Sequence, residues 1–242
     1  MKRLLLNFSL LFCGLTTVAC TATQISSALQ TYSDLTGDGG ELTTAEVIEG
    51  LKEALVIGAE NSTAATSKLD GFFGNPEIRI PFPPEIEEVQ TRLRQLGLNK
   101  LVDDFNLSIN RAAEKASAEA TALFINAISS MTVEDAWGIL KGKEDAATEY
   151  LKRTTSAQLE NKFRPIISNA LESVNATKYY EEITTAYNRI PLVNKVDTDL
   201  TNYVNNKALD GLFLMVAREE AKIRKDPVAR TTELLQRVFS QQ

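Results

Sequence analysis

The sequence predicts an all-α fold, a multi-helix bundle with one extended, Pro-rich arm and a flexible N-terminal stalk. Apolar residues recur at three- and four-residue steps over most of the chain after residue 43, which is the period of an amphipathic helix. Prolines cluster between residues 76 and 84, where they forbid a helix. The two cysteines, Cys13 and Cys20, both lie near the N-terminus, so the fold depends on a hydrophobic core rather than on a disulfide.

The N-terminus has the pattern of a bacterial export signal. Two basic residues precede an apolar run over residues 4–15, which is shorter than the ~20 residues that span a bilayer. Small residues then lead to Cys20, as in lipoprotein signals, where residues 1–19 are removed and the Cys is acylated. Thr17 departs from the aliphatic residue usual at its position. The alternative is an ordinary secretory signal cleaved near Ala22, which would discard Cys20.

A lipid on Cys20 would hold the domain at a membrane surface without a membrane-crossing helix. By resemblance to bacterial lipoproteins, Thr21 rather than Asp after the Cys favours the outer membrane, with the domain on the periplasmic side of the cell envelope. The membrane is therefore an expected partner through the lipid anchor. Secretion into the periplasm is the alternative.

Composition excludes several functions. Removal of residues 1–19 takes two of the 26 basic side chains and none of the 32 acidic ones, which lowers the net charge from −6 to about −8. Such an acidic chain, without a basic cluster, is not expected to bind nucleic acid. The absence of His excludes Ser-His-Asp triads and His-ligated zinc. No nucleotide or cofactor motif occurs, so no cofactor is expected.

Residues 20–42 are rich in Thr, Ser and Gly and predict the flexible stalk. Three side chains in it have the spacing of the first ligands of a calcium loop: Asp34, Thr36 and Asp38. The match then fails, because Glu41 occupies an apolar position and Ala45 stands where a carboxylate is required. A stalk that leads into a capped helix is the preferred interpretation, with calcium binding as the alternative.

Residues 43–242 are expected to form a single helical domain. Thr43 and Glu46 have the spacing of a capping box, so a helix is predicted over residues 43–69. Residues 71–86 predict the extended arm, with a short β-hairpin to another loop as the alternative. Further helices are predicted over residues 84–96, 99–129, 132–142, 144–154, 156–174, 178–188, 197–225 and 227–239, with a kink or break at Pro165.

Four segments resemble the motifs of a bacterial family of exported, often lipidated helical proteins, described only as a domain of unknown function. They are INRAAEKASAEA (109–120), MTVEDAWGILKGKEDAATEYLKRTT (131–155), ALDGLFLMVAREEAKIR (208–224) and DPVARTTELLQRVF (226–239). The resemblance covers nearly all of residues 43–240. It implies a helical envelope domain and supplies no catalytic residue, ligand or partner.

Two polar groups are candidate sites. Asn110 and Glu114 share one stripe of the Ala-rich helix, with Arg111 beside them, and could line a ligand pocket. The preferred interpretation is an i,i+3 ion pair between Arg111 and Glu114, next to small residues that let another helix approach. In the long C-terminal helix, Glu219 and Glu220 lie at the edge of the apolar face, where a carboxylate must be paired or protonated.

These observations favour a non-catalytic envelope lipoprotein that binds an apolar ligand between its helices or an envelope partner, either a protein or a peptidoglycan-associated one. One alternative is a carboxylate-dependent hydrolase acting on envelope material, with Glu114 and Glu219 as acid and base. Another is an oligomeric structural protein that associates through the Ala-rich helix.

Overall fold

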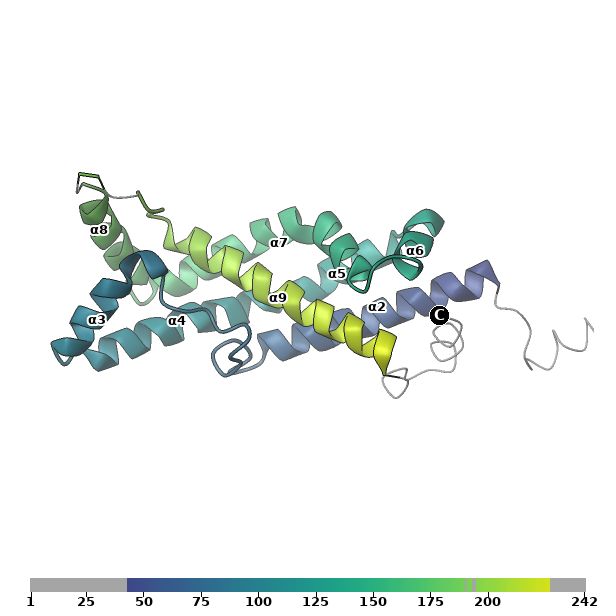
Figure 1. Ribbon diagram of the computed structural model, residues 1–242, viewed down its shortest axis with the longest axis horizontal. Coiled ribbons are helices and arrows are strands. Elements are labelled where there is room, and N and C mark those ends of the chain that lie inside the picture. The colour runs from purple at the N-terminus through teal and green to yellow at the C-terminus, as the bar shows by residue number, and fades with distance from the viewer. Residues whose placement is uncertain (1–42, 190, 193–194, 227–242) are drawn as a thin grey trace, which may run out of the picture. The chain divides into compact units, whose positions relative to one another are not determined.

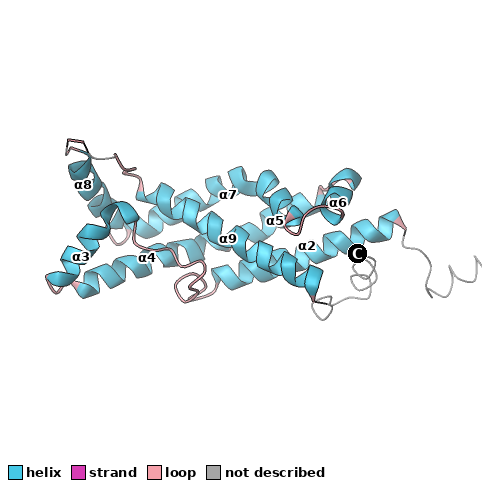
Figure 2. Cartoon of the chain, viewed as in Figure 1, coloured by secondary structure: helices cyan, strands magenta, loops and turns pink. Residues whose placement is uncertain are grey.

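Helices account for most of the residues that the computed structural model describes, which are 43–189, 191–192 and 195–226 (Figure 1). They are α2 (Thr44–Ser67), the 3-10 turn η1 (Pro84–Ile86), α3 (Glu87–Gln95), α4 (Asn99–Ser117), α5 (Ala120–Ser129), α6 (Val133–Leu140), α7 (Ala146–Glu172), α8 (Ala176–Asn188) and α9 (Leu200–Lys225). These ranges contain no strand (Figure 2). The predicted all-α bundle is confirmed.

Several predictions fall outside the described ranges. They concern the signal, the stalk, the calcium-loop residues Asp34, Thr36 and Asp38, Cys20, and the helix predicted over residues 227–239. Within the described ranges, no helix has the length and apolar character needed to cross a membrane.

Two helices begin at the capping boxes that the sequence predicts. The hydroxyl of Thr43 accepts from the backbone N–H of Glu46, whose carboxylate accepts from the backbone N–H of Thr43. Thr132 and Asp135 repeat this arrangement at the start of α6. Each box satisfies donors that an open helix end leaves unpaired.

The capping box of α6 predicts a measurable pH dependence. Hydrogen bonds from Thr132 hold the pKa of Asp135 below its ordinary 3.8. A lowered folded pKa contributes stability above the unfolded pKa, and this contribution disappears as the pH falls through the folded value. Asp135→Asn is therefore expected to cost about 0.5 kcal/mol at pH 7 and progressively less below pH ~4. Urea unfolding across this pH range measures the loss of unfolding free energy, with Glu134→Gln at an exposed position as the control. A loss that does not change with pH would contradict the lowered pKa of Asp135.

Helix α7 corrects the prediction of two helices over residues 144–154 and 156–174. It continues from Ala146 to Glu172 and contains Pro165. The hydroxyls of Thr154, Thr155 and Ser156 each donate to a backbone carbonyl three or four residues earlier. The hydroxyls of the Thr-Thr-Ser stretch thus find their hydrogen-bond partners within the helix, and the stretch does not end the helix.

The single helix predicted over residues 99–129 is also wrong, because it is two helices. The backbone N–H of Glu119 donates to the carbonyl of Ala116, a three-residue bond that separates α4 from α5. Near the start of α4, Leu101 is 51% exposed, whereas the neighbouring Val102 is buried.

The core lies where α4, α7 and α9 pack together, with α2 against α9 and α5. Four alanines of the predicted Ala-rich helix are completely buried: Ala112, Ala113, Ala116 and Ala120. Their small side chains let neighbouring helices approach closely. Other helices of the same chain therefore cover these alanines.

The segment between α2 and η1 is the predicted arm, and it lies against the helices as a series of turns followed by extended backbone. Phe72, Ile78 and Ile80 are buried, while Phe73 and Phe82 are partly exposed. Gly211 of α9 allows the close approach, since a Cβ there would lie 2.6 Å from a ring carbon of Phe72. The alternative β-hairpin does not form in the described residues.

Candidate functional site

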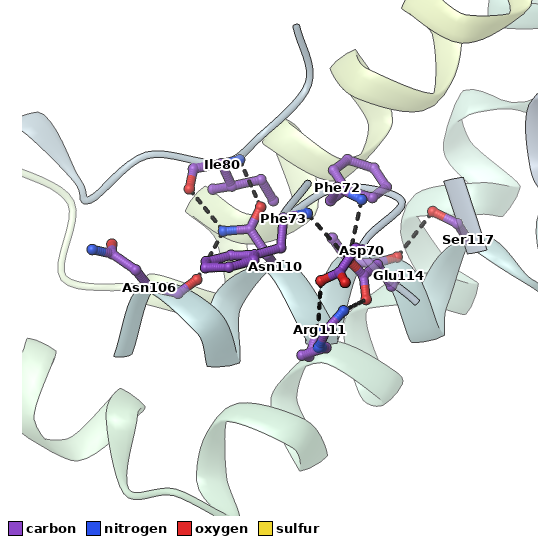
Figure 3. Close-up of polar contacts among 10 residues, drawn as sticks. Asp70, Phe72, Phe73, Ile80, Asn106, Asn110, Arg111, Glu114 and Ser117 are labelled. Carbon is purple, nitrogen blue, oxygen red and sulfur yellow. Dashed lines mark hydrogen bonds and ion pairs between the residues drawn. The ribbon is translucent and has the colours of Figure 1, made fainter. Parts of the chain in front are cut away.

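The predicted polar stripe of α4 faces the arm (Figure 3). Asn110 is completely buried, and its Oδ1 accepts from the backbone N–H of Ile80 at 2.8 Å. Its Nδ2 donates to the carbonyl of Ile80 at 2.9 Å and to the carbonyl of Asn106 at 2.8 Å. One carboxamide therefore satisfies both backbone groups of a buried arm residue, as a neighbouring strand would.

Glu114 holds the first part of the arm in the same way. Its Oε1 accepts from the backbone N–H groups of Phe72 and Phe73, both at 3.1 Å, and its Oε2 pairs with Arg111. Arg111 also reaches Asp70 at 2.7 Å. The hydrogen bond to Glu114 raises the pKa of Arg111, although burial opposes the shift. The predicted Arg111–Glu114 ion pair is confirmed, and it belongs to a network that fastens the arm.

Removing the Asn110 carboxamide tests this fastening. Asn110→Ala leaves the buried N–H and C=O of Ile80 without their partner, so it is expected to lower the free energy of unfolding by about 2 kcal/mol. Urea unfolding measures the loss. Ser117→Ala is the matched control on the same stripe, because the Ser117 hydroxyl donates only to the carbonyl of Ala113 in its own helix. Equal losses in the two variants would contradict the fastening role of Asn110.

The two adjacent carboxylates of α9 have different environments. Glu220 is buried and accepts from the backbone N–H groups of Ala147 and Thr148 at 3.0 and 2.9 Å and from the Thr148 hydroxyl at 2.8 Å. It also pairs with Arg224 at 2.9 Å. Glu220 thus binds the N-terminus of α7, where the helix dipole favours a negative charge.

Glu219 instead accepts from the side chain of Asn61 at 3.0 Å and pairs with Lys222 at 3.2 Å. In the described part of the chain, no hydrogen bond or ion pair joins it to Glu114. The two carboxylates named for acid–base chemistry each have structural partners of their own. Nor do the described ranges contain a group of three or more acidic, Cys or His side chains that could hold a metal ion.

A small hollow lies between α2, α7 and α9, and it is lined by apolar residues such as Leu51, Ala54 and Leu151 together with Glu220 and Arg224. It has room for about 30 Å³, enough for roughly one or two water molecules. Sites for drug-sized molecules have volumes of ~300–1,000 Å³. This hollow is too small for an apolar ligand.

A much larger groove of about 620 Å³ lies along the arm, which we call the arm groove. Its walls come from the arm, α3, α4 and α9. The side chains that line it include Arg79, Phe82, Gln90, Asn106, Tyr203 and Lys207. Sequence analysis missed this groove, because its residues are up to 131 positions apart and only packing brings them together. The cluster of prolines was the available signal.

Two aromatic residues shape the arm groove. Phe82 packs on Phe105 of α4 with 4.8 Å between ring centroids. The Tyr203 hydroxyl donates to the carbonyl of Pro81 at 3.3 Å and so ties α9 to the arm. Burial raises the pKa of Tyr203 to about 12, so the phenol keeps its proton, and its hydrogen bond, even in alkaline solution.

These features define an all-α bundle with a fastened arm and an open groove beside it. The chain belongs to the family described as "Protein of unknown function (DUF4197)", which matches residues 41–240. No curated protein and no solved structure matches the chain.

Proposed function

We propose that this protein is a non-catalytic lipoprotein of the bacterial envelope whose helical domain binds an envelope partner in the arm groove. The groove carries the proposal, because its volume of about 620 Å³ lies within the range of ligand sites. Asn110 and Glu114 fix the backbone of the arm, which keeps one wall of the groove in place before a partner arrives. Preorganised walls lower the entropy cost of binding.

The groove favours a surface partner over an apolar ligand held between helices. Its lining combines Phe82 and several prolines with Arg79, Gln90 and Lys207, a mixture typical of peptide and protein recognition. The interior hollow of about 30 Å³ offers no comparable space. The involvement of Glu114 in fastening the arm supports a binding role over hydrolysis, since both of its oxygens already have partners.

The envelope location rests on the N-terminal signal and on Cys20. Cells grown with a labelled fatty acid should incorporate label into the wild-type protein, and Cys20→Ser should abolish it. The wild-type protein should also fractionate with the outer membrane. Export of an unlabelled chain cleaved near Ala22 would contradict lipidation and support secretion into the periplasm.

Site-specific photo-crosslinking in living cells tests the groove. A photoreactive residue in place of Gln90, which lines the arm groove, should give a discrete adduct after irradiation. The same residue in place of Glu134, exposed on α6, should not give that adduct. Identical adduct patterns at the two positions, or none at position 90, would contradict a binding role for the groove.

A further inference from the structure

The arm groove contains two cations that could recognise a negatively charged ligand. Arg79 of the arm and Lys207 of α9 both line the groove, and both also line a smaller hollow of about 200 Å³ beside it. The two hollows share Arg79, Ile80, Pro81 and Lys207, so these residues form the boundary between them. Both cations therefore line each of the two hollows.

Arg79 is held in position without its hydrogen-bonding capacity being used. Its guanidinium lies 4.2 Å from the ring centroid of Phe73, which also belongs to the arm. The guanidinium of Arg111 lies 5.9 Å from the same centroid. Arg79 is exposed and makes no ion pair with the described residues. An arginine stacked on an aromatic ring in this way can still donate two parallel hydrogen bonds to a carboxylate.

Lys207 adds a second positive charge with only a loose internal partner. Its Nζ lies 3.8 Å from Asp210, which is exposed and lines the smaller hollow rather than the larger one. Glu87 is the acidic residue on the larger groove, whereas Glu77 of the smaller hollow already pairs with Arg218 at 2.7 Å. The lining of the larger groove therefore carries two cations and one carboxylate, and Glu85 acts electrostatically on its Tyr203.

The groove also offers amide recognition next to these cations. Gln90 of α3 lines it with a carboxamide, which can accept from an N–H group and donate to a carbonyl. Asn106 lines it too, but its Oδ1 atom is buried and closed to a ligand. A ligand that matches this set carries both a free carboxylate and amide N–H groups.

We propose that the arm groove binds the stem peptides of peptidoglycan, with Arg79 and Lys207 on a stem carboxylate and Gln90 on a stem amide. This inference rests on the proposed envelope function and specifies its ligand. Stem peptides are short and combine free carboxylates with backbone amides and small aliphatic side chains such as those of alanine. Phe82 and the prolines of the arm provide apolar contact for their small aliphatic groups.

Binding of a purified disaccharide–tetrapeptide to the full chain in detergent micelles tests the proposal. Saturable binding is expected, and the double variant Arg79→Gln with Lys207→Gln should weaken it at least tenfold. Lys141→Gln is the matched control, because Lys141 is also an exposed cation stacked on an aromatic ring, 4.9 Å from the centroid of Trp137. It should leave the affinity unchanged. The same tetrapeptide with amidated carboxylates should lose affinity to the level of the double variant.

Each outcome decides between the proposals. No binding of the tetrapeptide, or binding that the double variant and amidation leave unchanged, would overturn stem-peptide recognition. If position 90 nevertheless gives a protein adduct in cells, the proposed binding role of the groove stands and only its ligand is wrong. Circular dichroism of the double variant should match the wild type, since neither side chain contributes to the buried core.

Discussion

Replacing Glu220 with alanine is expected to lower the free energy of unfolding by about 3–5 kcal/mol. The variant removes the acceptor of two backbone N–H groups and one hydroxyl at the N-terminus of α7. It also removes a carboxylate that pairs with Arg224, whose side chain is only 12% exposed. Loss of one member of a buried ion pair costs more than the pair contributes, because the remaining charge stays in a poorly solvated place.

The neighbouring carboxylate supplies the control for this prediction. Glu219→Ala removes a partly exposed ion pair and one side-chain hydrogen bond, so a loss of about 1 kcal/mol is expected. Glu220→Gln should lie between the two, since a carboxamide oxygen can still accept from the N-terminus of α7. Urea unfolding of the three variants measures these differences. A Glu220→Ala loss no greater than that of Glu219→Ala would show that the α7 contact does not stabilise the bundle.

The sequence predicted the helices well because their signals are local. Periodicity and two capping boxes lie within a few residues of the elements they define, and α2 and α6 begin where predicted. The break between α4 and α5 has no such signal, because the two residues at the break are Ala118 and Glu119, and neither is a helix breaker such as Gly or Pro. The continuity of α7 at residue 155 was missed for the opposite reason, since the polar Thr-Thr-Ser stretch resembles a helix boundary but its hydroxyls bond within the helix.

The role of the candidate residues could not be predicted from local pattern. Spacing placed Asn110 and Glu114 on one stripe, but their partners on the arm are 30 and 42 positions away. Glu220 binds residues 73 and 72 positions earlier. Polar side chains on an apolar face must find partners, and which partners they find depends on the packing of distant segments. A buried polar stripe therefore indicates a constraint without revealing whether that constraint concerns a ligand or the fold.

Fastening of the arm links stability to the proposed binding site. Asn110 and Glu114 hold the arm from α4, Gly211 lets it approach α9, and the Tyr203 hydroxyl joins α9 to the carbonyl of Pro81. The arm in turn presents Arg79 and Phe82 to the groove. Residues buried behind the arm are thus positioning residues for the groove, and changing them should alter binding without any direct contact with a ligand.

Replacing Glu114 with alanine is the strongest test of this link. The variant leaves the N–H groups of Phe72 and Phe73 without their acceptor and removes one of the two carboxylates that pair with Arg111. We expect a loss of about 2–4 kcal/mol in the free energy of unfolding, less than for Glu220→Ala because the Arg111 side chain is 32% exposed and keeps Asp70. Urea unfolding measures the loss.

Glu114→Gln separates a structural role from a catalytic one. Its carboxamide oxygen can still accept from both arm amides, so the expected loss is about 1 kcal/mol, and hydrogen exchange at Phe72 and Phe73 should remain slow. In Glu114→Ala these two amides should exchange quickly, and tetrapeptide binding should weaken in parallel because the arm no longer holds Arg79 in place.

A Glu114→Gln protein that keeps its stability and tetrapeptide binding yet loses a hydrolytic activity of the wild type would instead identify Glu114 as a catalytic acid. Equal exchange rates in the two variants would show that the carboxylate does not fasten the arm.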